Sequence, residues 1–172
     1  AHMLIKKKNI RPSIILSEKQ TKGRGTMGKK WISKKGNLFL TIFFDMSKKK
    51  VDFKKFSVLN AHLLKSILIK KFSNKIKIKW QNDLLYQEKK ICGILQETVI
   101  KGEKKYLIVG IGINTNLDPK NCSFSSTSLS HITKKNIDNK NLFIMIKKNY
   151  EKFLHKANRN SFLELKKFTK KL

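Results

Sequence analysis

"ICGILQETVI" (91–100) and "YLIVGIGIN" (106–114) are two apolar runs separated by the short charged segment "KGEKK" (101–105). Both runs are rich in isoleucine, leucine and valine, which suits a β-strand, and the segment between them carries a glycine that suits a turn. We therefore predict two paired strands joined at 101–105, with the rest of the chain organised around the sheet that they begin.

Three further segments are expected to add strands. Residues 12–18 ("PSIILSE") and 36–44 ("GNLFLTIFF") are short apolar runs rich in β-formers. Residues 75–80 ("KIKIKW") alternate strictly, which predicts a strand with its three lysines on one side and its two isoleucines and Trp80 on the other.

Two longer segments, 53–72 and 141–157, have apolar residues at helical spacing with lysines between them, and a third helix is expected from about Ser161. The intervening segment 81–90 ("QNDLLYQEKK") is expected to be a polar turn or hairpin connection. No internal repeat or low-complexity linker divides the chain. The fold class that fits is one α+β domain with a mixed, largely antiparallel β-sheet and helices packed against it.

Composition bounds the class of protein. With 172 residues, 40% of them hydrophobic, the chain is large enough for a buried core and too apolar for a disordered protein. It has no run of the roughly 18–20 apolar residues that cross a bilayer, and no secretion signal at its start. Cys92 and Cys122 lie far apart with no C-x-x-C pair, which favours a reducing, cytoplasmic setting. Residues 1–2 resemble an expression scar, with the natural start expected at Met3.

The net charge of +29 suggests a nucleic-acid-binding protein. However, only Arg11, Arg24 and Arg159 are arginines, and lysines are spread over every segment, as an AT-rich genome would produce. We therefore favour a solvated surface over a DNA footprint. The scarcity of arginine also singles out Arg24.

Arg24 lies in a glycine-rich stretch, "QTKGRGTMGKKW" (20–31). Its three glycines permit positive φ and let backbone N–H groups approach a ligand closely. Arg24 can hold a carboxylate or phosphate in bidentate fashion, and Trp31 could close the site as a lid or stacking face. A surface turn with chance basic residues is the alternative, because the spacing matches neither a Walker A loop nor a dinucleotide fingerprint.

A second cluster is "KWQNDLLYQEKKICG" (79–93). Asn82 and Asp83 could simply form an Asx turn, and the two lysines could simply be exposed. In the functional interpretation, Lys90 begins a strand beside Gly93, so that its ammonium reaches an anion lying over the sheet. Asp83 would then orient an incoming amine, and Asn82 would hydrogen-bond a phosphate or hydroxyl.

The third cluster is "GIGIN" (110–114), in which strand parity puts Gly110, Gly112 and Asn114 on one face and the aliphatic residues on the other. Two glycines on one face remove packing, so something else is expected to occupy that space, either a close-packed helix or a ligand. Cys92 and the histidines show no metal-ligand spacing, and we expect no metal held by protein side chains.

In this order the clusters resemble the catalytic domain of biotin protein ligases, whose motifs are GRGRxGRxW, KWPNDL, K-hydrophobic-x-GIL-x-E and GIGIN. The counterparts here are "GRGTMGKKW" (23–31), "KWQNDL" (79–84), "KICGILQE" (90–97) and "GIGIN" (110–114). "SEKQT" before the loop and "TSL" at 127–129 also match, so the resemblance covers the chain from about Ile10.

The resemblance implies an ATP-dependent biotin–[acetyl-CoA-carboxylase] ligase in the cytoplasm. Biotin and MgATP would give biotinyl-5′-AMP and pyrophosphate, and a lysine amine of a biotin carboxyl carrier protein would then displace AMP. The resemblance also makes a homodimer through a sheet edge possible.

It further implies roles for residues in all three clusters. The implied catalytic residues are Arg24, Lys90 and Asp83. The implied biotin-binding residues are Gln20, Arg24, Gly25, Thr26, Lys90, Gly93 and Gly112. The implied ATP- or adenylate-binding residues are Gly23, Arg24, Lys29, Trp31, Asn82 and Asn114.

Some positions depart from the family pattern. Thr26 stands where the family has a second loop arginine, which suggests that the activated intermediate leaks, a hypothesis that fails if no biotinyl-adenylate is released without acceptor. Lys29 replaces another arginine and keeps the charge, and Gln81 replaces proline at a small loss of turn rigidity.

Residues 3–172 are expected to form a single ligase catalytic domain. It would lack the family's N-terminal Ser-Thr-Asn segment, its DNA-binding winged helix and its C-terminal SH3-like domain, which leaves the biotin pocket incomplete. A truncated form, a misassigned start and a reduced enzyme all remain open. The alternative functions are a catalytically impaired biotin-binding remnant, a lipoate or octanoyl transferase relative, and a nucleic-acid-binding module.

Overall fold

The computed structural model describes residues 1–172 apart from 7–9, 48, 50, 81, 121–123 and 172. Its strands are β1 (Ser13–Ser17), β2 (Leu38–Asp45), β3 (Ile76–Lys79), β4 (Asp83–Tyr86), β5 (Lys89–Lys101) and β6 (Lys104–Ile113). Its α-helices are α1 (His2–Ile5), α2 (Phe53–Lys71), α3 (Leu129–Thr133), α4 (Asn139–Ala157) and α5 (Phe162–Lys171). The α+β prediction is confirmed. Gln81, which replaces the proline of the family pattern, and Cys122 lie outside the described residues.

The strands form one six-stranded sheet in the order β1-β2-β6-β5-β4-β3, with every described pairing antiparallel. The predicted hairpin is the longest pairing, β5 with β6, in which Gly93 faces Gly112 and Lys101 faces Lys104. These two strands, 13 and 10 residues long, are the central pair of the sheet.

The expectation of a polar turn at 81–90 is wrong for its middle, where β4 pairs with both β3 and β5. Its connection to β5 is a tight turn at Gln87 and Glu88, both with positive φ. Hairpin turns of this kind usually contain Asn or Gly, so the sequence offered no turn signal that would have separated the strand from its neighbours.

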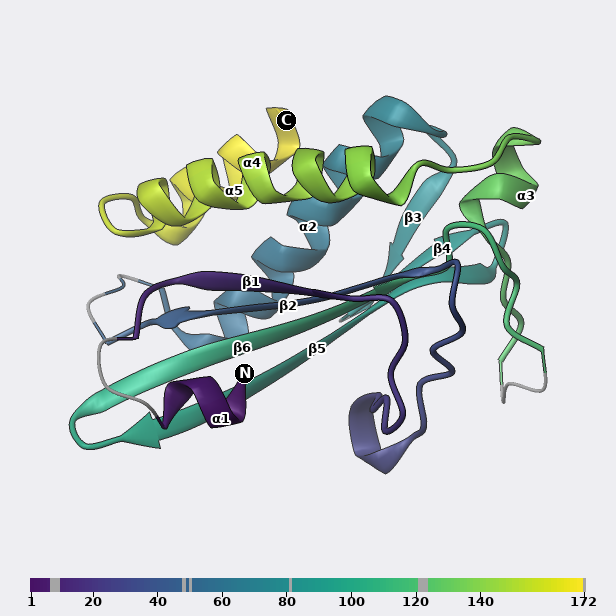
Figure 1. Ribbon diagram of the computed structural model, residues 1–172. Helices are drawn as coiled ribbons and strands as arrows, with labels where there is room; N and C mark the ends of the chain where they lie inside the picture. Colours follow the sequence, from purple (N-terminus) through teal and green to yellow (C-terminus); the bar gives the residue numbers. More distant parts are fainter. Residues whose placement is uncertain (7–9, 48, 50, 81, 121–123, 172) are drawn as a thin grey trace.

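Alternation along the strands divides the sheet into a covered and an open face. α2, α4 and α5 lie together on one face, while α1 and the loop between β1 and β2 lie on the other (Figure 1). Leu40 and Ile42 of β2, and Val109 and Ile111 of β6, are buried in the main core on the helix side. Intervening residues such as Phe43 belong to a smaller cluster on the opposite side.

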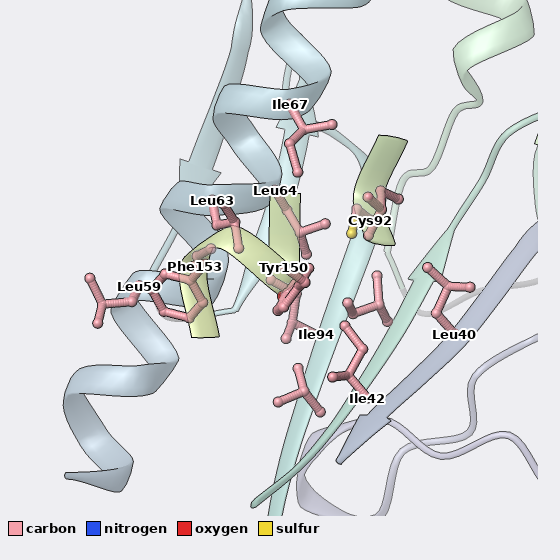
Figure 2. Packing of buried hydrophobic residues seen from close by; sticks show 14 of the residues in the cluster. Leu40, Ile42, Leu59, Leu63, Leu64, Ile67, Cys92, Ile94, Tyr150 and Phe153 are labelled. Atoms are coloured by element: carbon pink, nitrogen blue, oxygen red, sulfur yellow. The ribbon is translucent and has the colours of Figure 1, made fainter. Parts of the chain in front are cut away.

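The covered face is closed by aromatic packing. Phe153 of α4 is fully buried, with its ring edge-on to those of Phe56 and Tyr150 at centroid separations of 6.0 and 6.2 Å. Figure 2 shows Tyr150 and Phe153 between α2 and the strands, beside Leu59 and Leu63. The three predicted helices therefore do what their amphipathic patterns indicated, since their apolar stripes meet the aliphatic side of the sheet.

β3 bears out its predicted alternation only within the strand. Ile76 is buried and the neighbouring lysines are exposed, but Trp80 lies beyond the end of the strand and is 68% exposed. The strand predicted over 75–80 is therefore two residues shorter than expected, running from Ile76 to Lys79. Among the described residues, none of the helices has the length and apolar character that crossing a bilayer requires.

Candidate active site

The open face of the sheet contains a cavity of about 210 Å³. Its walls come from the loop at 20–31, from Thr41 of β2, and from residues of β5 and β6. Ala1 and His2 also contribute to its lining. The predicted glycine loop, the β4–β5 cluster and the GIGIN strand therefore meet at one place, although they are far apart in sequence.

The floor of the cavity is made by Gly93 and Gly112, which face each other across β5 and β6. The indole of Trp31 lies on this floor. A Cβ atom added at Gly93 would be 2.7 Å from Trp31 Cζ3, and one at Gly112 would be 2.7 Å from Trp31 Cζ2, distances that no real Cβ tolerates. The space above the glycines is occupied, as expected, but not by a close-packed helix or a ligand as predicted: its occupant is the Trp31 side chain of the loop.

The ammonium of Lys90 lies at the side of this cavity in a nearly closed environment. Its Nζ is 2.7 Å from Asp83 Oδ1, and the two side chains are only 14% and 22% exposed. The same Nζ lies 5.1 Å from the centroid of the Trp31 ring and 4.6 Å from that of Phe124. The carboxylate and both aromatic faces contact the ammonium and hold it at one position.

Backbone hydrogen bonds fix Lys90 to a second segment. Its N–H donates to the Ser125 carbonyl at 2.9 Å, and its own carbonyl accepts from Thr127 N–H at 3.0 Å. This short bridge brings Phe124 beside the ammonium. The position of Lys90 is thus set by β5 on one side and by residues 124–127 on the other.

A second hollow, of about 330 Å³, adjoins the first. The two share Gly25, Thr26, Trp31, Asp83 and Lys90, so the Trp31–Lys90–Asp83 group lies between them. Basic side chains predominate around the second hollow: Lys29, Lys30, Lys79 and Lys90, against the carboxylates of Asp83 and Glu88. Such a lining suits an anionic ligand next to the glycine-floored cavity.

Arg24 is engaged within the chain. Its Nη2 donates to Glu97 Oε2 at 2.8 Å, and Glu97 also lies 3.6 Å from His2 Nε2. The arginine side chain is 60% exposed, so this ion pair can exchange with solvent or with a ligand anion. Arg24 and Glu97 both line the first cavity.

Two amides of the site are held by neighbouring groups. Ser33 Oγ, buried at the base of the loop, donates to Gln20 Oε1 at 2.7 Å. Asn82 Nδ2 donates to the Ile94 carbonyl at 2.9 Å, and the Ile94 N–H donates back to the Asn82 carbonyl at 2.8 Å. The first contact leaves the amide nitrogen of Gln20 as the donor that can face the cavity.

Most of the residues predicted for the site line one of the two hollows. These are Gln20, Arg24, Gly25, Thr26, Lys29, Trp31, Asn82, Asp83, Lys90, Gly93 and Gly112.

Two predicted residues lie outside both linings. Gly23 is buried at the base of the loop, where an added Cβ would be 2.7 Å from Ser33 Oγ. Asn114 is fully buried just beyond β6, and its amide donates to the carbonyls of Lys90 and Thr127 at 3.3 and 3.1 Å. In the described chain both residues support the local structure. Their role in binding the adenylate stays a prediction.

Sequence reasoning did not select Glu97, Phe124 or Ser33 as site residues. Glu97 stands in the "KICGILQE" motif, so its place in the pattern was a usable signal. Phe124 and Ser33 act through contacts made across the fold, which no local pattern revealed.

Other reactive groups are structural. Cys92 is buried on the covered face, and burial, with a smaller contribution from Asp83, raises the pKa of its thiol well above the ordinary value. No three His, Cys, Asp or Glu side chains among the described residues are placed to hold a metal ion.

Comparisons with known proteins agree with this geometry. The sequence profile of the "Biotin/lipoate A/B protein ligase family" matches residues 4–114. The "Bifunctional ligase/repressor BirA" of Escherichia coli is 35% identical over 101 residues, 58% of this chain and 32% of that protein. The BirA of Bacillus subtilis is 31% identical over 146 residues, 80% of this chain and 44% of that protein. The chain thus spans less than half the length of these relatives.

Solved structures show the same fold over nearly the whole chain. The biotin protein ligase from Aquifex aeolicus, in complex with biotin and ATP, superposes with a TM-score of 0.80 at 29% identity, covering 95% of this chain and 69% of that one. The lipoate-bound LipL1 of P. falciparum, at 18% identity and a TM-score of 0.53, shares the fold alone. Since the family profile covers residues 4–114, more than half of the sequence, this protein belongs to the biotin/lipoate A/B protein ligase family.

Proposed function

We propose that the protein is a biotin protein ligase. In the first step a carboxylate oxygen of biotin attacks the α-phosphorus of ATP, pyrophosphate leaves, and biotinyl-5′-AMP forms. In the second step a lysine amine of a biotin carboxyl carrier protein attacks the biotinyl carbonyl carbon and AMP leaves. The carrier would be a subunit of acetyl-CoA carboxylase or a related carboxylase.

The observation that carries this proposal is that Arg24 and Lys90 line the same cavity above a floor of two glycines. Bringing a carboxylate up to a phosphate places two anions together, so the site must supply positive charge where they meet. Arg24 comes from a flexible glycine loop and Lys90 from a rigid strand. Their convergence is what the reaction requires and what a chance surface turn would not produce.

The lysine-rich second hollow fits the phosphate side of the reaction. Lys29 and Lys30 belong to the same loop as Arg24, and Lys79, which ends β3, also lines this hollow. We assign the glycine-floored cavity to biotin and the adjoining hollow to the nucleotide, with Lys90 between the two. In that position its ammonium can contact both the carboxylate and the phosphate that react.

Asp83 is assigned to the transfer step. The acceptor lysine must lose a proton before it attacks, although the pKa of a free lysine is near ~10.4. Asp83 lines both hollows and uses Oδ1 to pair with Lys90, which leaves its second oxygen to accept from an incoming amine. It would thereby orient the amine beside the activated carbonyl.

Magnesium would enter with ATP and not on protein ligands. Asp83 and Glu97, the acidic residues that line the first cavity, are already paired with Lys90 and Arg24. A divalent ion held by the phosphates would offset their charge and leave these two pairs intact. This is consistent with a site whose protein groups are mainly cationic.

The test is biotin-dependent exchange of pyrophosphate into ATP, measured for the protein and for Lys90→Ala. We expect exchange with biotin and a loss of roughly 10²–10³-fold in Lys90→Ala, the range for removing one group that stabilises developing charge. Lys89→Ala is the matched control, because Lys89 is the neighbouring lysine and is exposed. Equal rates for the two variants would contradict the assignment of Lys90.

Other outcomes of the same experiment identify the alternatives. Calorimetric binding of biotin without any exchange would indicate a binding remnant, and exchange with lipoate but not biotin would indicate a lipoate-specific relative. Salt-sensitive DNA binding without biotin binding would indicate the nucleic-acid class. Thr26, which replaces a loop arginine of the family, is exposed and lines both hollows. Release of biotinyl-AMP in the absence of acceptor would support the hypothesis that this replacement weakens binding of the intermediate.

A further inference from the structure

The ammonium of Lys90 is contacted by two aromatic rings that come from different segments. Trp31 belongs to the glycine-rich loop and lines both hollows, whereas Phe124 lies beyond β6 in the chain and lines the second hollow. The centroid of the Phe124 ring is 4.6 Å from Nζ, against 5.1 Å for Trp31. At such distances the negative face of an aromatic ring attracts an ammonium. Phe124 therefore holds the ammonium on the side of the hollow that we assign to the nucleotide.

The position of Phe124 is coupled to the backbone of Lys90. The Ser125 carbonyl accepts from the Lys90 N–H at 2.9 Å, and Thr127 N–H donates to the Lys90 carbonyl at 3.0 Å. Asn114, which is fully buried, donates to the carbonyls of both Lys90 and Thr127. The neighbour of Phe124 is thus bonded to the same residue whose ammonium the ring contacts. This arrangement fixes the ring relative to the ammonium.

Trp31 is supported separately. Its N–H donates to the Gly23 carbonyl at 2.9 Å, and Gly25 N–H donates to the Lys29 carbonyl at 2.6 Å, so these bonds lie within the glycine-rich loop. The two rings reach one ammonium from independently built segments. Of these segments, the one that carries Phe124 is hydrogen-bonded to the backbone of Lys90.

The place of the ammonium decides which charge it can stabilise. Lys90 and Asp83 line both hollows, and Nζ lies 2.7 Å from Asp83 Oδ1. A lysine ammonium is a point charge on a flexible four-carbon stem, so a single partner does not fix its direction. The ring of Phe124 adds a contact on the nucleotide side and restricts that freedom. A group that is already in place when the reactants bind lowers the entropic part of the barrier.

We propose that Phe124 is a positioning residue for formation of the adenylate. Its ring face holds the Lys90 ammonium at the junction of the two hollows, where the carboxylate and the α-phosphate are to meet. The inference rests on the proposed function, because it concerns the lysine that we assign to that step. Phe124 acts through Lys90 and takes no part in the bonds that form and break.

Phe124→Leu keeps an apolar side chain and removes the ring face. We expect the maximal rate of biotin-dependent pyrophosphate exchange to fall about 5–30-fold, the range for a cation–π contact that is shielded from water. The KM values for biotin and ATP should change much less, because the loss concerns charge that develops in the transition state. Phe124→Tyr, which keeps the ring face, should retain most of the rate.

The same assay separates the two levels of the argument. Exchange by the unmodified protein with an equal rate in Phe124→Leu would overturn the role of Phe124 and leave the proposed function standing. No exchange by the unmodified protein would overturn both.

Fluorinated phenylalanines at position 124 test the ring face itself. Fluorine withdraws electron density from the ring, so adding one, two and then three fluorines weakens its attraction for a cation stepwise. We expect the maximal exchange rate to fall at each step and to approach that of Phe124→Leu. A flat series would mean that the ring serves only as apolar packing, and would overturn the proposal. Because these proteins keep the aromatic side chain, they decide the question if Phe124→Leu does not fold.

A double-mutant cycle with Lys90→Ala tests whether Phe124 acts through the lysine. Two residues that act as a unit give non-additive losses. We therefore expect Phe124→Leu to have no further effect on the residual exchange of Lys90→Ala. The same loss in both backgrounds would mean that the ring contacts the nucleotide directly, which would overturn the positioning role.

Phe168→Leu is the matched control. Phe168 of α5 has its ring centroid 5.1 Å from Lys156 Nζ, so it makes a contact of the same kind among the helices of the covered face. We expect the folded variant to exchange pyrophosphate at the rate of the unmodified protein. Equal losses in Phe168→Leu and Phe124→Leu would show a general effect of removing a ring, and would overturn the proposal.

Discussion

The two faces of the sheet are built from alternate residues of the same strands, yet they have opposite properties. On the helix-covered face, Cys92, Ile94, Val109 and Ile111 are packed into one continuous core. On the open face, a loop tryptophan rests against Gly93 and Gly112 beside an open cavity that all three residues line. The hairpin β5–β6 therefore supports the fold with one set of side chains and the site with the next.

The polar groups of the two faces differ in the same way. On the covered face Tyr150 Oη donates to Asn60 Oδ1 at 3.0 Å, and Asn60 Nδ2 in turn donates to Gln96. On the open face the Trp31 Nε1–H has no partner among the described residues, and Arg24 is held by a partly exposed ion pair. The polar groups of the face that provides stability are hydrogen-bonded to one another. The face that we assign to binding has an unpaired donor and an ion pair that a ligand can replace.

The largest effect is a loss of stability that we expect from a substitution on the covered face. Phe153→Ala removes a fully buried ring that contacts Phe56 and Tyr150, and cavities of this kind cost about 3–5 kcal/mol. Urea denaturation followed by circular dichroism measures the free energy of unfolding. Biotin affinity, measured where the variant is still folded, should be little changed.

The control for this change is Leu163→Ala in α5. Leu163 is 69% exposed, so its truncation should alter the free energy of unfolding by no more than about 0.5 kcal/mol. If the two variants were equally stable, the helices would contribute far less than their burial indicates.

The next largest effect is a loss of biotin binding that we expect from a substitution on the open face. Gly112→Ala puts a methyl group into the slot that holds the indole, so we expect biotin binding to weaken about 10–100-fold, or about 1.4–2.8 kcal/mol. Isothermal calorimetry measures the loss. Stability should change much less than in Phe153→Ala, because the new methyl group does not enter the helix-side core.

Gly110→Ala is a matched control on the same face of the same strand. Its added Cβ would meet Leu95 at 3.7–3.8 Å, an ordinary contact, and would leave the indole untouched. We expect it to bind biotin nearly as well as the unmodified protein. Similar losses at both glycines would show that the strand backbone, and not the Trp31 slot, limits binding.

The sequence predicted the covered face better than the open one. The helices over 53–72 and 141–157 agree with α2 and α4 within about two residues, because their apolar spacing directly encodes the stripe that is buried. β4 was missed, since a four-residue strand with polar flanks and a turn at Gln87 and Glu88 has no distinct pattern. The sequence analysis also missed α1 and α3, because helices of four and five residues are too short to show a distinct apolar pattern.

For the site, the sequence predicted which residues converge but not how they contact one another. Two glycines on one strand face indicated a filled space, and Trp31 proved to be its occupant. The pair between Arg24 and Glu97 joins residues 73 positions apart, and local patterns carry no information about such a contact. The aromatic contact of Phe124 with Lys90 depends on a bridge between two distant segments for the same reason.

A smaller loss of stability is expected when the polar network of the covered face is broken. Tyr150→Phe removes the hydroxyl that donates to Asn60 and leaves a buried amide oxygen without that donor. Such a group costs about 1–3 kcal/mol. Urea denaturation measures the cost, and an unchanged midpoint would show that water replaces the hydroxyl. Burial raises the pKa of Tyr150 well above its ordinary value, so this hydroxyl keeps its proton at neutral pH.

The smallest effect is a pH dependence at the outer surface of the covered face. Burial lowers the pKa of His62 in α2 below its ordinary 6.5, and Lys166, Lys170 and Lys65 lower it further. Below pH 6.5 the imidazole is therefore protonated more readily in the unfolded chain than in the folded chain. The stability that His62 contributes is fully present above pH 6.5 and is lost as pH falls through the folded pKa. Urea midpoints of the unmodified protein and of His62→Gln, which does not titrate, should diverge below pH 6.5 and run parallel above it. Because His62 is only half-buried, solvent screens its repulsion from the lysines, and a divergence as large as that of Tyr150→Phe would contradict this account.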